Sequence, residues 1–468
     1  MSPDRYSGSM AACSSDRMAE QQAIAFLEEG NAADPCLLDD GMSDWLSYGE
    51  LKERVSDWRR RLDRQRALVF LYAYNDAETV AALFGAMSAG HVVALLDPKL
   101  PTAGKEALQA AHSPEMVMNS EVADDSLEAA PVEGLLNDDL SLLLSTSGST
   151  GSPKFVRLTL DNLVSNARAI SDVLTIGSDS VASGHLPLHY SFGLSVLTSH
   201  LISGARVCLT NCSFLDRDFW KRAKDAGVSH LPGVPFHYSM MERLGYSRLD
   251  LPELRCMVQA GGHLDVAARE RAYAYMEKRS GQFYVMYGQT EAAPRMTTLQ
   301  HEAFLLAPAS VGTPLPGGKI TIDDADENGC GEVVYTGPNV CMGYAECRSD
   351  LAAGDVFNQV LHTGDMGFLD REGRLTLTGR AKRSAKVFGL RVNLDEVEKL
   401  SNTLCESAAI GSDTNLHIFY VGGDVDVLRA LLLSHFSLPP ASYVFHRVEQ
   451  LPRSERGKID YRALESLA

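Results

Sequence analysis

The longest apolar stretch of the chain, residues 80–96, is interrupted by Gly90 and His91. Apolar positions before the glycine recur with the period of a helix, whereas those after it form an uninterrupted run of strand length. The pattern therefore predicts a helix over residues 77–89, a glycine stop and a buried strand over residues 91–96. It argues against a membrane span, because a span needs about 20 consecutive apolar residues.

A short apolar strand is predicted before this helix, over residues 67–72. Strand, helix and strand at this spacing form a βαβ unit with two parallel strands, which indicates an α/β fold. Other helices and strands follow from the same periodicities. We expect helices over residues 19–29, 48–63, 162–173 and 216–226, with Ser47 or Tyr48 and Asp161 at two of the N-termini, and strands over residues 142–144 and 254–259.

Residues 310–318 and 331–344 predict turns and strands of a smaller, β-rich subdomain. The Asn-Gly pair within residues 324–332 is typical of a hairpin turn. A chain of 468 residues exceeds one compact domain, so two or more domains are expected.

Composition and charge narrow the function without identifying it. The 45% hydrophobic and 22% charged residues are ordinary for a globular protein. The net charge of −18, without a run of Lys or Arg, argues against nucleic acid or an anionic membrane as the main partner. Nine scattered cysteines indicate free thiols, and the polar start lacks the apolar core of a signal peptide. We therefore expect a cytoplasmic protein without a membrane span.

The apolar residues 142–144 open into a stretch of small and hydroxylated residues that ends in Lys154. Bare backbone N–H groups and hydroxyls can donate hydrogen bonds to phosphate, and the ammonium adds a positive charge. The spacing is not that of a Walker A loop, because Lys154 neither follows a glycine nor precedes Ser or Thr. Taken alone, such a stretch is more often a flexible loop.

The segment Thr146-Ser-Gly-Ser-Thr-Gly-Ser-Pro-Lys154 resembles the phosphate loop of the adenylate-forming superfamily. This superfamily includes acyl-CoA synthetases, nonribosomal-peptide adenylation domains and luciferases. Five further segments follow in the family's order, so the resemblance covers most of the chain. It implies ATP and Mg²⁺ as cofactors, with phosphate contacts from Thr146, Ser147, Gly148, Ser149, Thr150, Gly151 and Lys154.

The rest of the nucleotide site is expected at the end of a strand in Tyr287-Gly288-Gln289-Thr290-Glu291, where open α/β sheets bind ligands. Tyr287 offers a face for adenine, Thr290 a hydroxyl for phosphate and Glu291 a carboxylate for Mg²⁺. The resemblance adds the backbone of Gly261 and Gly262 against the adenine and the acyl group. It further implies that Asp365 and Arg380 contact the ribose.

For the acid, the resemblance points to the segments around residues 185–195 and 230–237, the second of which predicts a strand and a rigid turn. The first segment has no aspartate to pair with an α-amino group, which disfavours an amino-acid substrate. The pocket candidates are His189, Tyr190, Val234, His237, Ala260 and Ala292.

The polar residues 1–20 are expected to form a disordered tail. The resemblance divides the rest of the chain into an AMP-binding domain over residues 21–380 and a mobile α+β domain over residues 381–468. It places a hinge at Lys382 and a catalytic lysine at Lys458, although Phe155 stands where the family usually has glycine. Catalytic roles are thereby expected for Lys458, Glu291 and Thr290.

These residues together predict an enzyme that adenylates a small carboxylic acid and passes the acyl group to the thiol of coenzyme A. A carboxylate is a poor electrophile, and an acyl-AMP anhydride removes its charge and provides a leaving group. One alternative is a stand-alone adenylating enzyme whose acceptor is the phosphopantetheine thiol of a separate carrier protein or an amine. The other is a non-catalytic nucleotide-binding protein, which the presence of Glu291, Lys458 and Asp365 disfavours.

Overall fold

The computed structural model falls into two units of contacting residues. The first is made of Met1–Lys319 and Tyr335–Leu361, and the second of Ile320–Val334 and His362–Ala468. Each unit is described by itself. The structure describes residues 25–119, 135–145, 154–380, 384–387, 390–412, 415–436, 438–453 and 459–468.

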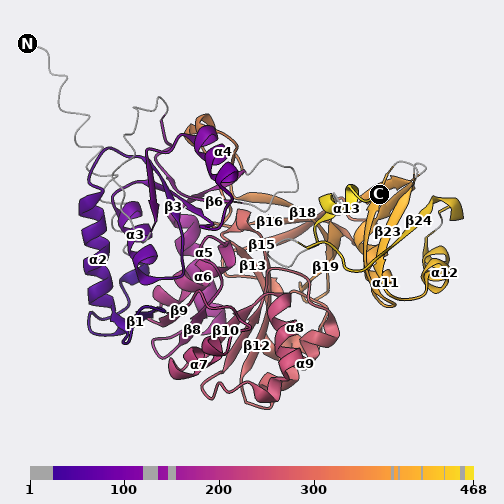
Figure 1. Cartoon of the computed structure of the whole chain (residues 1–468), viewed down its shortest axis with the longest axis horizontal. Coiled ribbons are helices and arrows are strands. Elements are labelled where there is room, and N and C mark those ends of the chain that lie inside the picture. Colours follow the sequence, from indigo (N-terminus) through magenta and orange to yellow (C-terminus); the bar gives the residue numbers. More distant parts are fainter. Residues whose placement is uncertain are drawn as a thin grey trace, which may run out of the picture. The chain divides into compact units, whose positions relative to one another are not determined.

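A nine-stranded sheet forms the larger part of the first unit (Figure 1). Its central strands β8 to β12 are parallel, and β13 and β14 extend one edge in antiparallel fashion. In spatial order the strands are β14 (Thr313–Pro314), β13 (Arg295–Leu299), β12 (Gln282–Gly288), β11 (Cys256–Gln259), β10 (His230–Gly233), β8 (Val181–Gly184), β9 (Arg206–Leu209), β1 (Pro35–Leu38) and β2 (Leu46–Ser47).

A six-stranded sheet completes the first unit and contains the expected βαβ unit. Strands β3 and β4 pair in parallel with Leu68 opposite Val92, and helix α3 (Ala77–Ser88) connects them. The prediction for residues 67–96 is thereby confirmed. The spatial order is β17 (Gly343–Ala345), β7 (Phe155–Thr159), β6 (Leu140–Ser145), β4 (Val92–Leu96), β3 (Leu68–Tyr72) and β5 (Met116–Asn119).

Helices α3, α5 and α6 share one buried apolar cluster with a face of each of these two sheets. Every residue of α6 is buried, as expected of a helix covered on all sides. The first unit is therefore layered, with helices between two sheets. Its helices are α2 (Tyr48–Arg61), α3, α4 (Thr102–His112), α5 (Leu160–Leu174), α6 (Ser191–Leu201), α7 (Arg217–Asp225), α8 (Pro235–Leu244), α9 (Val266–Glu277) and α10 (His301–Phe304), with 3-10 turns at Ala25–Leu27, Tyr246–Arg248, Thr290–Ala292 and Arg348–Ala352.

Two predicted helix boundaries need correction. Helix α5 begins at Leu160, and its N-cap is Thr159 instead of Asp161, because Thr159 and Asn162 exchange side chain to backbone hydrogen bonds of 3.0 Å. The helix expected over residues 19–29 is only a 3-10 turn at Ala25–Leu27 in its described part. By contrast, α2 starts at Tyr48 with Ser47 as its N-cap, as predicted.

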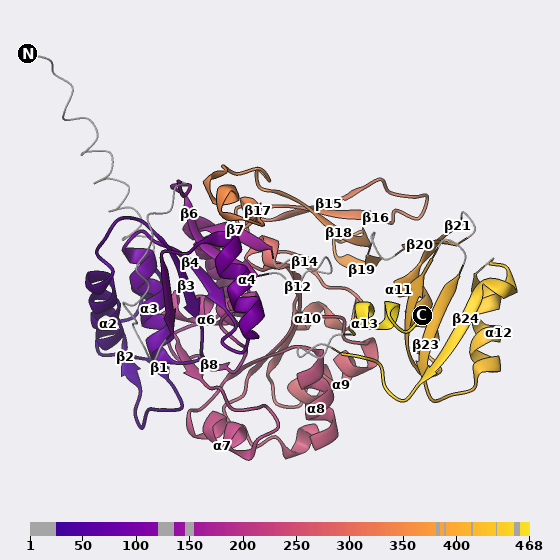
Figure 2. The same cartoon turned by 45° about the horizontal axis from the view of Figure 1, so that its top comes forward.

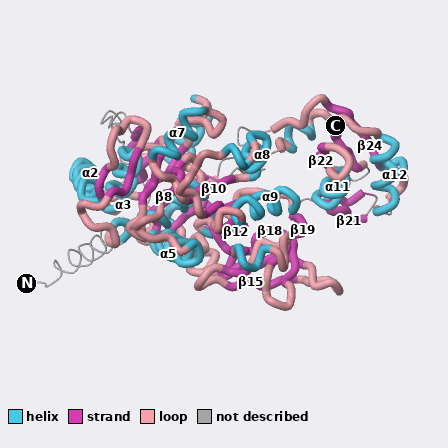
Figure 3. The backbone as a smooth tube through the Cα atoms, turned by 90° about the horizontal axis from the view of Figure 1, so that it is seen from below, coloured by secondary structure: helices cyan, strands magenta, loops and turns pink. Residues whose placement is uncertain are grey.

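The second unit contains three sheets. A four-stranded sheet has the order β15 (Lys319–Asp323), β16 (Gly331–Thr336), β18 (Val360–Leu369) and β19 (Leu375–Arg380), and the expected hairpin turn joins β15 to β16. Helices α11 and α12 pack beside the three-stranded sheet (Figure 3). The remaining elements are β20 (Ser384–Val387), β21 (Leu390–Asn393), α11 (Leu394–Ser401), β22 (Glu406–Gly411), β23 (Leu416–Val421), α12 (Val425–His435), a 3-10 turn at Pro440–Ser442, β24 (Tyr443–Val448) and α13 (Tyr461–Glu465).

The division into units differs from the boundary expected after residue 380. Strands β18 and β19 pair with each other and join β15 and β16 in one sheet, so most of this sheet groups with the C-terminal elements. The expected hinge at Lys382 lies outside the described residues and stays a prediction, as does the tail over residues 1–20.

Within the described ranges, no helix combines the length and the apolar character that crossing a bilayer requires. The cysteines of these ranges are free thiols. Half of them are buried, all in the first unit, namely Cys36, Cys208, Cys256 and Cys341.

Three buried histidines make the stability of the fold depend on pH. Burial lowers the pKa of His112 and of His230 to about 4 and lowers that of His200 well below its ordinary value. In the unfolded chain these side chains titrate near pH 6.5. As the pH falls from about 6.5 to 4, the unfolded state binds protons that the folded state does not, so stability is lost.

We expect the midpoint of thermal unfolding to fall by about 10 °C from pH 7 to pH 5. The measurement is circular dichroism melting across this range. In a His112→Leu variant the pH dependence should be weaker, because His112 packs on Phe155 and neither of its ring nitrogens has a hydrogen-bond partner in the described structure. Equal midpoints at pH 5 and pH 7 would contradict the expectation.

Candidate active site

The segment after strand β12 carries the polar residues expected to bind a nucleotide. The strand is buried until Tyr287 and ends at Gly288, where a Cβ would lie 1.9 Å from the carbonyl oxygen of Pro294. Only glycine fits this close approach of two backbone segments. The chain then turns at Thr290–Ala292, which places Thr290 and Glu291 at the carboxyl end of the strand.

A line of three side chains connects Glu291 to the end of the expected phosphate loop. The hydroxyl of Tyr344 donates to Oε1 of Glu291 at 2.8 Å, and Nζ of Lys154 lies 3.5 Å from the centre of the Tyr344 ring. Burial, and then the Glu291 charge, raise the pKa of Tyr344, so its hydroxyl stays a hydrogen-bond donor at neutral pH. Tyr344 therefore fixes one carboxylate oxygen of Glu291 through its hydroxyl and holds the ammonium of Lys154 over its ring.

Arg157 positions Tyr344. Strand β17, which carries Tyr344, pairs with β7, and Tyr344 lies opposite Val156 (Figure 2). The buried guanidinium of the adjacent residue, Arg157, donates to the carbonyl oxygens of Met342, Tyr344, Ala353 and Gly354. Sequence reasoning missed both Arg157 and Tyr344. The available signal for Arg157 was a charge between two apolar neighbours, Val156 and Leu158.

Thr290, in the segment expected to bind the nucleotide, contacts the first segment expected to bind the acid, residues 185–195. Its Oγ1 lies 3.1 Å from Oγ of Ser191, the first residue of helix α6. Tyr190 caps this helix, and Nε2 of His189 lies 3.6 Å from Oδ2 of Asp97. Thus the two segments, about 100 residues apart in the chain, meet at a pair of hydroxyls.

Residues of the two expected acid-pocket segments lie close to the backbone of Gly261. Its φ of +76° favours glycine, and a Cβ at this position would lie 2.7 Å from the Tyr190 hydroxyl and 3.0 Å from Cγ1 of Val234. The same Cβ would lie 3.6 Å from the ring of Phe192. Because the glycine has no side chain, a flat group can approach its backbone between these three residues.

The other pocket candidates have structural partners around this position. The strand predicted within residues 230–237 is confirmed as β10, but a helix follows it instead of the predicted rigid turn, because Pro235 begins α8. His237 accepts a hydrogen bond from the backbone N–H of Val234 at 3.2 Å and packs against Phe214. Ala260 and Ala292 are buried, and the carbonyl oxygen of Ala292 accepts from Asn339. A Cβ on Gly262 would lie 3.2 Å from Pro235.

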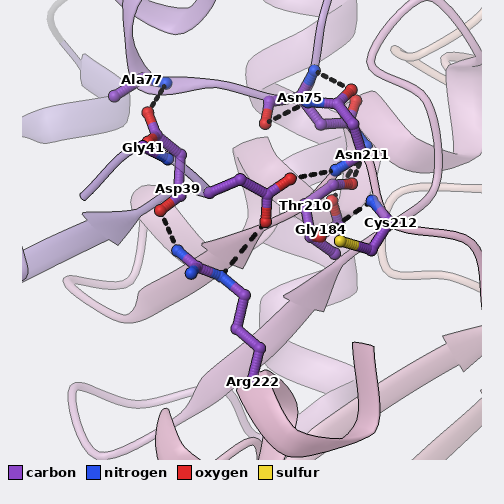
Figure 4. A network of polar contacts seen from close by, with 10 residues as sticks. Asp39, Gly41, Asn75, Ala77, Gly184, Thr210, Asn211, Cys212 and Arg222 are labelled. Carbon is purple, nitrogen blue, oxygen red and sulfur yellow. Dashed lines mark hydrogen bonds and ion pairs between the residues drawn. The ribbon is translucent and has the colours of Figure 1, made fainter. Parts of the chain in front are cut away.

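Asn75, which the sequence did not single out, joins the ends of strands from both sheets (Figure 4). Its amide donates to the carbonyl oxygens of Gly184, Leu186 and Thr210, and its Oδ1 accepts from the backbone N–H of Leu188. Asn75 follows strand β3, whereas its partners follow β8 and β9. The segment that leads into the acid-pocket residues is thereby tied to the six-stranded sheet.

The second unit brings together the two residues expected at the ribose. Asp365 and Arg380 are cross-strand partners on β18 and β19, with Nε of Arg380 3.0 Å from Oδ1 of Asp365. The aspartate is 6% exposed, whereas 64% of the arginine side chain is accessible. The backbone N–H of Arg380 donates to Asp395 at 2.7 Å, which fixes the end of the strand.

Some expected site residues lie outside the described residues. They are Lys382, Lys458 and the phosphate-loop residues Thr146, Ser147, Gly148, Ser149, Thr150 and Gly151. Their assigned roles stay predictions.

Residues 103–345 match the family model described as AMP-binding enzyme. A 2-succinylbenzoate–CoA ligase of Bacillus cereus is 30% identical over 360 residues, which is 72% of this chain and 72% of the relative. A component of the linear gramicidin synthase of Brevibacillus parabrevis is 24% identical over 90% of this chain, which covers 6% of that protein.

Solved structures share the fold. The o-succinylbenzoate CoA synthetase (MenE) from Bacillus subtilis in complex with the acyl-adenylate intermediate OSB-AMP aligns with a TM-score of 0.77 and 21% identity, covering 96% of this chain and 97% of that one. At this identity the alignment supports the fold class predicted from the sequence, an α/β protein with a large and a smaller part.

Proposed function

Since the chain belongs to the family of AMP-binding enzymes, we propose that it joins a small carboxylic acid to coenzyme A at the expense of ATP. It is an acid–thiol ligase that first forms an acyl-AMP with release of pyrophosphate and then transfers the acyl group to a thiol. The observation that carries the proposal is the anchored carboxylate of Glu291, which follows strand β12 and is held by Tyr344, whose ring lies under the ammonium of Lys154.

The donor set fits Mg²⁺ held partly by the nucleotide. Among the described residues, no group of three or more His, Cys, Asp and Glu side chains could hold a metal ion. Mg²⁺ usually binds through one or two carboxylates together with substrate phosphates. We assign this carboxylate to Glu291, whose Oε1 is held by Tyr344. Bound there, the ion supplies positive charge where charge develops on the transferred phosphoryl group.

The protein must bring an anionic acid to an anionic triphosphate, so its task is to supply cations and hydrogen-bond donors. We assign phosphate contacts to Thr290 and Lys154, together with the loop over residues 146–151. Lys458 contributes its charge to the carboxylate and the α-phosphate. We also assign Tyr287 to adenine, and Asp365 and Arg380 to the ribose hydroxyls.

The small residues Ala260, Gly261 and Ala292 support a flat acyl group near Tyr190 and Val234. Because a relative is a 2-succinylbenzoate–CoA ligase, 2-succinylbenzoate is the first acid to test. We also propose a cytoplasmic location, where free thiols persist, and coenzyme A as the acceptor before a carrier-protein phosphopantetheine arm.

The test is pyrophosphate release from ATP and Mg²⁺ across a panel of aromatic and aliphatic acids, each with and without coenzyme A. Turnover that requires one class of acid and coenzyme A supports the proposal. Pyrophosphate release at the same rate with and without coenzyme A would assign the second step to a carrier protein or an amine. Absence of turnover with every acid would contradict adenylation of a carboxylate.

We expect Asp365→Asn to raise the KM for ATP about tenfold or more with a smaller change in kcat, because a carboxylate that accepts two ribose hydroxyls contributes binding. The measurement is initial rate against ATP concentration. Glu372→Gln is the matched control, since Glu372 is an exposed carboxylate on the β18–β19 hairpin and pairs with Arg374. An unchanged KM in Asp365→Asn would remove Asp365 from the nucleotide site.

A further inference from the structure

Arg295, the first residue of strand β13, carries a buried guanidinium with little to bind. The residue is 2% exposed, and its Cζ lies 4.6 Å from the centre of the Phe192 ring. Nη1 donates to the weak acceptor Sδ of Met286 at 2.9 Å. Within the described residues, Nε has no hydrogen-bond partner and no carboxylate forms an ion pair with Arg295. A buried cation in this state is costly unless an anion joins it.

Other buried arginines of the same unit have an evident structural task. The guanidinium of Arg157 donates to four backbone carbonyl oxygens, and Nη1 of Arg269 donates to those of Pro308 and Ser310. At Arg295 the backbone is held independently, since its N–H and carbonyl oxygen bond to Asn166 and the carbonyl also accepts from Asn339. The side chain is therefore not needed to hold its own segment.

The guanidinium lies beside the acid-pocket residues. Phe192 contacts it directly, and the same ring would lie 3.6 Å from a Cβ on Gly261. Met286, which accepts from Arg295, shares a buried cluster with Ala260 and Phe192. One aromatic ring thus separates the unpaired cation from the backbone against which the acyl group is proposed to lie.

We propose that Arg295 binds a second carboxylate of the acid substrate, which makes the enzyme a ligase for dicarboxylic acids. The inference rests on the proposed acyl-CoA ligase function and deepens it. The carboxylate that is adenylated reacts at the nucleotide, and the remote one pairs with Arg295 beyond Phe192. Arg–carboxylate pairs are frequently bidentate, which would use donors that now have weak partners or none.

The charge of Arg295 persists at neutral pH. Burial lowers its pKa to about 9, and no carboxylate opposes this effect. A monocarboxylic acid leaves the buried cation unpaired, whereas a diacid neutralises it. Discrimination of at least about 100-fold in kcat/KM is therefore expected, in line with the loss seen when one partner of a buried charge pair is removed.

The experiment compares acids that differ only in the second carboxylate, beginning with 2-succinylbenzoate and 4-oxo-4-phenylbutanoate, and including aliphatic diacids with their half-amides. Pyrophosphate release gives kcat/KM for the wild type, Arg295→Met and Arg295→Lys. We expect a diacid preference of at least about 100-fold in the wild type and its loss in Arg295→Met. Partial recovery in Arg295→Lys would mark the charge as the cause.

Arg269→Met is the control, because it removes another buried guanidinium of the same unit. It should keep the diacid preference but unfold at a lower temperature, since two carbonyl oxygens lose their donor. Without acid, Arg295→Met should unfold no lower than the wild type. A large fall in its unfolding temperature would assign Arg295 a structural role and contradict the proposal.

A second readout separates this proposal from the ligase function. The diacid should raise the unfolding temperature of the wild type but not that of Arg295→Met, whether or not turnover occurs. Equal kcat/KM for diacids and monoacids would overturn the role of Arg295 and leave the ligase intact. If no acid is adenylated, the ligase proposal fails, and the unfolding shift alone decides whether Arg295 binds the carboxylate.

Discussion

Adenylation by a Glu291→Gln variant is expected to fall about 100- to 1000-fold, the loss typical of removing one preorganised charge from a transition state. Glutamine keeps the size of the side chain and can still accept from the Tyr344 hydroxyl at Oε1. What it loses is the negative charge to which we assign the binding of Mg²⁺. The measurement is acid-dependent pyrophosphate release over a range of Mg²⁺ concentrations.

Tyr344→Phe is the matched control, because it keeps the carboxylate of Glu291 and removes only the hydroxyl that holds it. Its ring still lies under Lys154. We expect about a tenfold loss, the cost of one net hydrogen bond in positioning the carboxylate. Equal losses in both variants would mean that the hydrogen bond, and not the charge, is what Glu291 contributes. Full activity in Glu291→Gln would exclude a metal-binding role.

Lys458→Ala is expected to reduce adenylation by a similar factor of about 100 to 1000 while thioester formation from supplied acyl-AMP and coenzyme A changes little. The resemblance places this lysine over the carboxylate and the α-phosphate in the first half-reaction only. Two assays are needed, one for pyrophosphate release and one for thioester formation from synthetic acyl-AMP.

Arg453→Ala provides the comparison for Lys458→Ala, since it removes a positive charge from the same stretch of sequence, and this charge is paired with Glu406 on the protein surface. Surface pairs of this kind contribute little, so both half-reactions should keep their rates. The predicted hinge at Lys382 would let the C-terminal domain take one orientation for adenylation and another for thioester formation. If Lys458→Ala impaired both half-reactions equally, this prediction would be wrong.

The sequence predicted most of the helices and strands whose formation depends on residues close to one another in the sequence. Helix α3 and strand β4 follow from one apolar stretch split by a glycine, and α2 begins at its expected cap. The start of α5 was misplaced because Thr159 and Asp161 are both favourable caps, and only the bonds between Thr159 and Asn162 decide between them. Competition between neighbouring cap residues makes the ends of a helix harder to predict from the sequence than the presence of the helix.

The residues that support the site could not be predicted in the same way. Arg157 bonds to carbonyl oxygens between 185 and 197 residues away, and Asn75 bonds to residues more than 100 positions later. Their roles depend on which strands become neighbours, which spacing does not reveal. Arg295 gave a weak signal, a charge directly after Pro294, but its lack of an acidic partner is visible only in the fold.

The second unit is built from two separate segments of the chain, and this affects how it folds during synthesis. Because this unit takes Ile320–Val334 and His362–Ala468, the ribosome makes its first strands before Tyr335–Leu361 of the other unit. Domains generally fold as units while they leave the ribosome, N-terminal first. Here strand β16, whose neighbours in the sheet are β15 and β18, must wait with one edge unpaired until the chain has been translated through β18 to Leu369. Slow translation beyond residue 336 would therefore prolong the time in which this nascent strand can pair with another chain.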